Sequence, residues 1–193
     1  MKKILVMMVF VIGMMLSWVG EAKAVDCPIG YSEVTVHMLI LGCEYDVIFC
    51  VDCSLNQSPI TTLIVKEAIP TYGPCGLFFS DVYNEIILQA SDNYFIKYNL
   101  CPTADDPPPC YEEEHGELTV VRYTCWKWDG VKYEPCSDGI CTTVYDVCWD
   151  ENIGYVYTLV SAVKTGDFLA CEGNEEPPVP TPGVCFEVET ACQ

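Results

Sequence analysis

Fourteen cysteines constrain this chain more than any other feature of its sequence. They make up about 8 % of the residues after position 24, near the level that marks a disulfide scaffold. Their number is even, so seven bridges can form, each stabilising by roughly 2–4 kcal/mol. Such a chain can fold around a modest core. The predicted structural disulfide residues are Cys27, Cys43, Cys50, Cys53, Cys75, Cys101, Cys110, Cys125, Cys136, Cys141, Cys148, Cys171, Cys185 and Cys192.

The first residues have the organisation of a secretory signal peptide. Two lysines precede an apolar run from Ile4 to Val19, and Ala22-Lys23-Ala24 supplies an Ala-x-Ala cleavage site. The apolar run is shorter than the ~20 residues that a spanning helix needs. The sequence therefore predicts cleavage after Ala24 and an exported protein, extracellular or periplasmic, with no membrane insertion after signal removal. Such oxidising compartments favour disulfides.

The charge balance is strongly acidic. The chain carries 28 Asp and Glu against 9 Lys and Arg, and residues 1–24 account for only one of those acids but three of the bases. A charge of this sign repels nucleic acids and anionic membrane surfaces, so we exclude both as partners. Another surface protein or a polysaccharide remains a candidate partner.

A stretch from Glu117 to Ala162 carries the strongest strand and turn signals. Asp129-Gly130 between β-prone runs predicts a two-residue type I′ hairpin, and residues 150–154 predict a longer hairpin loop. The first turn would pair Trp128 with Val131 and Trp126 with Tyr133. One face would then carry Trp126, Trp128, Val131 and Tyr133, and the other Cys125, Lys127, Lys132 and Glu134.

The N-terminal half adds further elements. Glu33 to Leu41 alternates as a strand does, and a turn at Leu41-Gly42 leads into a second strand over Tyr45 to Val51. Residues 60–69 predict a third strand. Ser80 or Asp81 can cap a helix that follows. We predict a mainly β (or α+β) fold of antiparallel hairpins cross-linked by disulfides, with one helix near residues 80–92.

Proline-rich acidic segments suggest the organisation of the chain. We expect a signal peptide over 1–24, a disulfide-rich β region with the helix over 25–102, a linker over 103–116 and an antiparallel β region over 117–193; the two β regions can also form one domain. A second such segment precedes a short last strand near Val184 to Val188. Proline- or glycine-containing loops favour two local bridges, Cys101–Cys110 and Cys136–Cys141.

Residues suited to catalysis are scarce. Cys50-Val-Asp-Cys53 has redox or zinc-knuckle spacing, but no helix start follows it and the compartment favours disulfides. Only His37 and His115 offer imidazole, and Gly-x-Ser-x-Gly is absent. The glutamates around His115 should raise the pKa of its imidazole. Clustered carboxylates allow at most a weak calcium site. We predict no catalytic, cofactor-binding or metal-binding residue and no cofactor.

The aromatic residues of the hairpin stretch leave two interpretations open. They are a candidate ligand platform for sugar rings, or they form the core of the sheet, which we favour because small cysteine-rich domains use aromatics this way. The platform residues are Trp126, Trp128, Trp149 and Tyr133. The corresponding functions are a non-enzymatic cell-surface, matrix or adhesion-type role, or a small carbohydrate-binding protein or carboxylate-dependent hydrolase.

Overall fold

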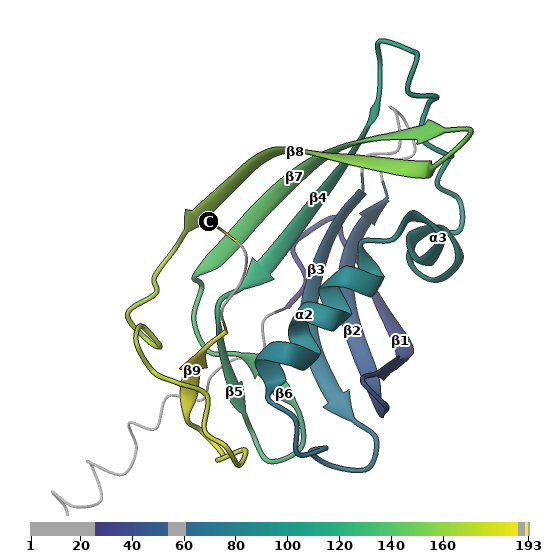
Figure 1. The fold of residues 1–193 in the computed structure, drawn as a ribbon. Coiled ribbons are helices and arrows are strands. Elements are labelled where there is room, and N and C mark those ends of the chain that lie inside the picture. Colours follow the sequence, from purple (N-terminus) through teal and green to yellow (C-terminus); the bar gives the residue numbers. More distant parts are fainter. Residues whose placement is uncertain (1–25, 54–60, 189–191, 193) are drawn as a thin grey trace, which may run out of the picture.

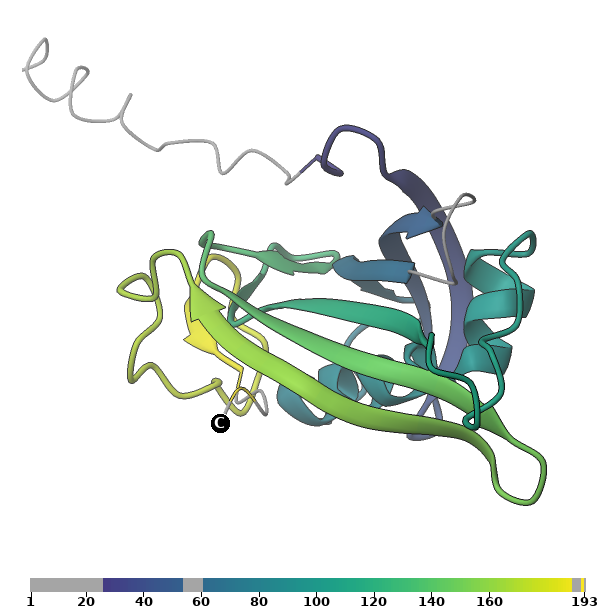
Figure 2. The same ribbon diagram turned by 90° about the horizontal axis from the view of Figure 1, so that it is seen from above.

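The computed structural model describes residues 26–53, 61–188 and 192. The predicted signal peptide and residue 60, the first of the predicted third strand, lie outside the described residues. Figure 1 shows the described chain as one curved sheet with a helix across its concave side, and Figure 2 shows the sheet bending around that helix.

Nine strands of the described region form one sheet. Its main path runs β1-β2-β3-β4-β7-β8, and β3 also pairs with β6, which continues through β5 to β9. Every pair is antiparallel except β3 with β4. The strands are β1 (Ser32–Ile40), β2 (Cys43–Cys53), β3 (Thr61–Pro70), β4 (Gly116–Tyr123), β5 (Cys125–Trp128), β6 (Tyr133–Pro135), β7 (Ile140–Asp150), β8 (Gly154–Thr165) and β9 (Cys185–Glu187).

The predicted helix is α2 (Phe79–Ala90), which buries one apolar stripe against the sheet. Its buried residues recur every three or four positions, the spacing that one helix face requires. They are Phe79, Val82, Tyr83, Ile86, Ile87 and Ala90. The chain continues through a short helix α3 (Asn93–Phe95) and a π-helical turn η1 (Ile96–Leu100). The mainly β fold with one substantial helix is therefore confirmed.

Rings from both halves of the chain form the centre of the core. Phe79 of α2 stacks on Tyr133 with ring centroids 4.0 Å apart and lies 5.0 Å from Trp126. Trp126 is fully buried, and its indole N–H donates to the Tyr123 carbonyl at 2.8 Å. The hydrogen bond satisfies the one polar group that burial of the ring removes from water. The tryptophan face of β5 is thus buried, as expected.

The register predicted around Asp129-Gly130 is wrong by two residues. Trp128 pairs with Tyr133 rather than with Val131, so the connection spans four residues instead of two. The Asp129 carboxylate accepts hydrogen bonds from the amides of Val131 and Lys132 at 2.7 and 2.8 Å, which closes the wider turn. Because a shift of two preserves the strand period, the side chains of β5 and β6 keep the predicted faces.

Two other turns follow the sequence signals. Ile40 pairs with Cys43, so Leu41 and Gly42 form a two-residue turn, with positive φ values of 51° and 87°. Positive φ at both central positions is the requirement of a type I′ turn. Asp150 pairs with Gly154 across the tip of the β7–β8 hairpin.

All fourteen cysteines are paired in seven disulfides. The predicted local bridges Cys101–Cys110 and Cys136–Cys141 are wrong, because sheet pairing brings distant cysteines closer than local loops do. The bridge separations run from 23 to 51 residues. The pairs are Cys27–Cys50, Cys43–Cys75, Cys53–Cys101, Cys110–Cys148, Cys125–Cys171, Cys136–Cys185 and Cys141–Cys192.

The segment 103–116 lacks helix and strand up to Gly116, as its prolines predict, and it is fastened to the sheet. Pro109 bridges to Trp149 of β7, the Cys110 amide donates to the Trp149 carbonyl at 2.9 Å, and Cys110 is bonded to Cys148. On either side of this segment the two β regions share one sheet, because β3 pairs directly with β4 and β6.

Candidate functional site

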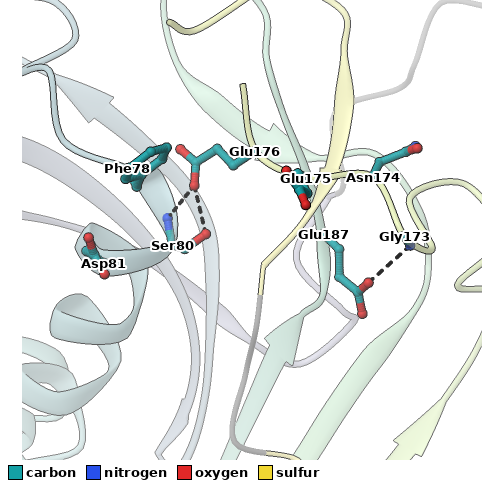
Figure 3. A pocket seen from close by; sticks show the side chains of 8 residues that line it. All are labelled: Phe78, Ser80, Asp81, Gly173, Asn174, Glu175, Glu176 and Glu187. Carbon is teal, nitrogen blue, oxygen red and sulfur yellow. Dashed lines mark hydrogen bonds between the residues drawn. The ribbon is translucent and has the colours of Figure 1, made fainter. Parts of the chain in front are cut away.

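A hollow of about 520 Å³ lies beside the N-terminal end of α2. The helix start supplies one wall and the Gly173–Glu176 loop with β9 supplies the other (Figure 3). We call it the α2 hollow, and its lining residues are Phe78, Ser80, Asp81, Gly173, Asn174, Glu175, Glu176 and Glu187. Four of these eight side chains are carboxylates, so the hollow is acidic.

Glu176 closes the first turn of α2 from outside the helix. Its carboxylate accepts hydrogen bonds from the Phe79 amide, the Ser80 amide at 2.9 Å and the Ser80 hydroxyl at 2.7 Å. A helix start has free amides and a partial positive charge, and a carboxylate compensates both. The capping role expected of Ser80 or Asp81 is therefore wrong, since Phe78 occupies the N-cap position and a distant glutamate takes the role.

The other carboxylates of the α2 hollow differ in how they are engaged. Glu187 accepts a hydrogen bond from the Gly173 amide at 3.3 Å (Figure 3). Asp81 and Glu175 are exposed, and among the described residues no hydrogen bond or ion pair engages either carboxylate. Phe78 adds a ring that is 51 % exposed. The hollow thus offers two open carboxylates and an apolar ring, a combination suited to hydroxyl or ammonium donors on a ligand with an apolar face.

A second hollow of about 450 Å³ lies at the tip of the β7–β8 hairpin. Trp149 lines it and packs edge-on against Tyr155 with centroids 4.7 Å apart. The Tyr155 hydroxyl donates to the Asp106 carboxylate at 3.2 Å, and its ring meets Tyr94 at 5.1 Å. Trp149 is half-buried, because one side of its ring packs against Tyr155.

The candidate aromatic platform is not a surface. Trp126, Trp128 and Tyr133 are 0 %, 6 % and 2 % exposed, and the rings of Trp126 and Tyr133 pack against Phe79 of α2. Trp149 lies apart from them at the β7–β8 tip. A ring without an exposed face cannot stack on a sugar, so these four residues do not form a shared binding platform.

Both histidines are bound to acidic residues of neighbouring strands. His37 Nδ1 lies 2.9 Å from Asp46, and His115 Nδ1 lies 2.7 Å from Asp146. The hydrogen bond to Asp146 raises the pKa of His115 above its usual range. The predicted direction agrees, but Asp146 is the main cause rather than the neighbouring glutamates. Neither of these two contacts includes the Ser, Thr or Cys nucleophile that a hydrolytic triad requires.

The remaining metal and redox motifs are used structurally. Cys50 is bonded to Cys27 and Cys53 to Cys101, so Cys50-x-x-Cys53 is not a dithiol. Within the described ranges, no group of three or more His, Cys, Asp or Glu side chains is arranged to hold a metal ion. In the same part of the chain, no helix has the length and apolar character to cross a membrane.

Comparison with known proteins gives no relative: no family model, no curated protein and no solved structure matches this chain. The function must therefore be argued from the molecule itself. Glu176 is the site residue that sequence reasoning missed. It lies in a proline-rich segment nearly a hundred residues after the helix that it caps, and no local pattern connects the two.

Proposed function

We propose that this protein is exported and serves a non-enzymatic cell-surface, matrix or adhesion-type role. One observation carries the proposal: disulfides fasten the loops and irregular segments to the sheet. Cys75, Cys110 and Cys171 each join such a segment to a strand, β2, β7 and β5 respectively. Loops are where proteolysis and local opening begin, so cross-links there favour durability in an exposed environment.

The use of the basic residues supports a binding surface rather than a catalytic one. Four lysines are paired with carboxylates: Lys66, Lys97, Lys127 and Lys132. Arg122 is buried and donates to the Thr143 hydroxyl, and Lys164 lies 6.0 Å from the Phe168 ring centre. The excess acidic side chains thus dominate the charge of the exterior. A surface of this kind favours a basic or hydroxyl-rich partner.

Localisation and durability test this proposal together. Fractionation of producing cells should place the chain outside the cytoplasm, and the oxidised protein should withstand protease until its disulfides are reduced. A thiol reagent should label no cysteine without a reductant. Retention in the cytoplasm, or rapid cleavage of the oxidised form, would contradict an exposed structural role.

A second candidate function is carbohydrate binding in the α2 hollow. The observation that favours it is the exposed Phe78 ring beside the open Asp81 and Glu175 carboxylates, because sugars combine apolar ring faces with hydroxyl donors. A polysaccharide array should show binding that Phe78→Ala and Glu175→Gln each weaken. Leu88→Ala, an exposed apolar change on a different face of α2, should leave binding unaltered.

A hydrolase is the catalytic version of the same candidate. If the α2 hollow cleaves a polysaccharide, Asp81→Asn should abolish product formation while preserving binding to the uncleaved polymer, whereas Glu175→Gln should reduce both. Binding by the wild-type chain without product would restrict the site to recognition. Absence of both would remove the carbohydrate candidate and leave the surface role unaffected.

A further inference from the structure

The outer strand β8 ends one side of the sheet and is paired on one edge only. All its pairings are with β7, and within the described residues no main-chain hydrogen bond joins it to any other segment. Figures 1 and 2 show no other strand along its outer side. A strand edge of this length presents a row of unpaired amide and carbonyl groups, which is a template for another strand.

The composition of β8 lacks the usual protection of such an edge. Its twelve residues read GYVYTLVSAVKT, with no proline, no carboxylate and a single lysine close to the end. Leu159, Val160 and Val163 are 56 %, 63 % and 51 % exposed. A register shift opposite Val144 and Tyr145 bends the strand near Val160, so the regular edge lies on its hairpin side, from Gly154 to Leu159.

The other ends of the sheet are protected. β1 carries Glu33, which is paired with Lys66 at 2.6 Å, and His37, which contacts Asp46. The outer side of β9 is covered by the loop that contains Asn174, whose carbonyl accepts the Glu187 amide at 2.9 Å. β8 is thus the one sheet end in the described region that has neither a charged cluster nor a covering loop.

We propose that β8 pairs with β8 of a second copy of this chain, joining two sheets across a two-fold axis. The charge distribution selects this occupant. Copies of a chain with a formal charge of −19 repel each other almost everywhere, but β8 contributes no negative charge to that repulsion. A basic partner would gain little on a strand without carboxylates, whereas another acidic copy finds there its least repulsive approach.

The ends of the strand are complementary under this symmetry. Antiparallel pairing of identical strands is closed and isologous, so the start of β8 in one copy meets the end of β8 in the other. Asp150 and Glu151 lie at the hairpin tip before β8, and Lys164 lies near its end. With Tyr157 on the axis, Gly154 of one copy meets Val160 of the other, so Lys164, which lies beyond the bend, is on the same side as the Asp150 and Glu151 hairpin tip of the other copy.

Sedimentation of the oxidised full chain over a range of concentrations tests this pairing. We expect a reversible monomer–dimer equilibrium, and Leu159→Glu should raise the dimer dissociation constant by at least about tenfold, since it puts a carboxylate inside the paired edge, opposite Tyr155 of the other copy. Leu39→Glu is the matched control, because Leu39 is 63 % exposed on the opposite sheet end, in β1. Intact mass and circular dichroism should show that both variants are folded and fully oxidised.

A charge reversal tests the orientation of the two strands. Lys164→Glu should weaken the dimer, and the added change Glu151→Lys should restore it, which no purely structural effect of either residue would produce. A chain that stays monomeric up to about 1 mM would overturn the proposal. So would a dimer that Leu39→Glu dissociates while Leu159→Glu does not, or open polymers, which would indicate head-to-tail pairing of β8 with β1.

Discussion

The two hairpins of the C-terminal half contain similar kinds of residue but lie in different environments. The β5–β6 hairpin places Trp126 and Tyr133 in the core, whereas the β7–β8 hairpin leaves Trp149 half-buried and Leu159 exposed. Both contain tryptophan, tyrosine and cysteine. The difference is position, because α2 packs its Phe79 ring on β5–β6, while β7–β8 extends past the helix to the sheet end (Figure 1). Aromatic content therefore does not identify a binding surface. Whether an aromatic side chain is exposed depends on whether a helix such as α2 packs over its strand.

The largest difference in stability between the two hairpins is expected when the tryptophan of each is replaced by alanine. Trp126→Ala should cost about 3–5 kcal/mol of unfolding free energy, because it removes a fully buried ring and leaves a cavity. Trp149→Ala should cost clearly less, since part of that ring already faces solvent. Denaturant titration of both variants measures the difference. Equal losses would show that the β7–β8 tip is as tightly packed as the core.

The second largest difference between the two hairpins is expected when a disulfide is removed from each. Replacing Cys125 and Cys171 by alanine should lower global stability by about 2–4 kcal/mol, since both are buried and tie the core hairpin to a distant loop. Replacing Cys110 and Cys148 should also destabilise, but it should first increase amide exchange in β7 and β8, because that bridge fastens the segment 103–116 to this hairpin. If amide exchange rises uniformly along the chain in both variants, the Cys110–Cys148 bridge has no local effect on β7 and β8.

The sequence predicted features that depend on neighbouring residues, but not contacts between residues that are far apart in the chain. Alternation in β1, the β-branched and aromatic residues of β2, the Leu41-Gly42 turn and the apolar spacing of α2 are local patterns, and local patterns indicate these elements. The bridge between Cys110 and Cys148 depends on β7 lying beside the segment 103–116, which no local pattern shows. The cap supplied by Glu176 is similarly non-local. At Asp129, hydrogen bonding by the side chain favoured a wider turn than the Asp-Gly pair predicts.

The candidate site shows the same limit more strongly. The aromatic platform was a pattern of residue types along two hairpins, and burial beneath α2 removes most of it from the surface. The α2 hollow combines residues 78–81 with residues 173–176 and 187, three segments that only the folded sheet brings together. Composition predicted that the surface would be acidic, but not where it would be hollowed.

A smaller effect is expected from the turn glycines. Gly130 has φ of +111° and no atom within 4 Å of an added Cβ, so Gly130→Val should cost about 1–3 kcal/mol through backbone strain alone. Val131→Ala is the matched control in the same turn; Val131 is 69 % exposed, and its truncation should stay within about 0.5 kcal/mol. Thermal unfolding of the two variants checks this. A neutral Gly130→Val would mean that the turn relaxes into another type without disturbing the core hairpin.

The smallest effect concerns the pH dependence of stability at the contact between His115 and Asp146 of β7. The hydrogen bond to Asp146 raises the pKa of His115 in the folded state, so folding favours the protonated imidazole. The resulting stabilisation is fully present below the pKa of the unfolded chain and is lost as pH rises through the folded-state pKa. The melting temperature of the wild type should therefore exceed that of His115→Gln most in mild acid, and the gap should narrow above neutral pH. His37→Gln serves as the control on β1, where the histidine is more exposed. A gap that widens as pH rises would mean that the neutral imidazole is the form that the fold prefers.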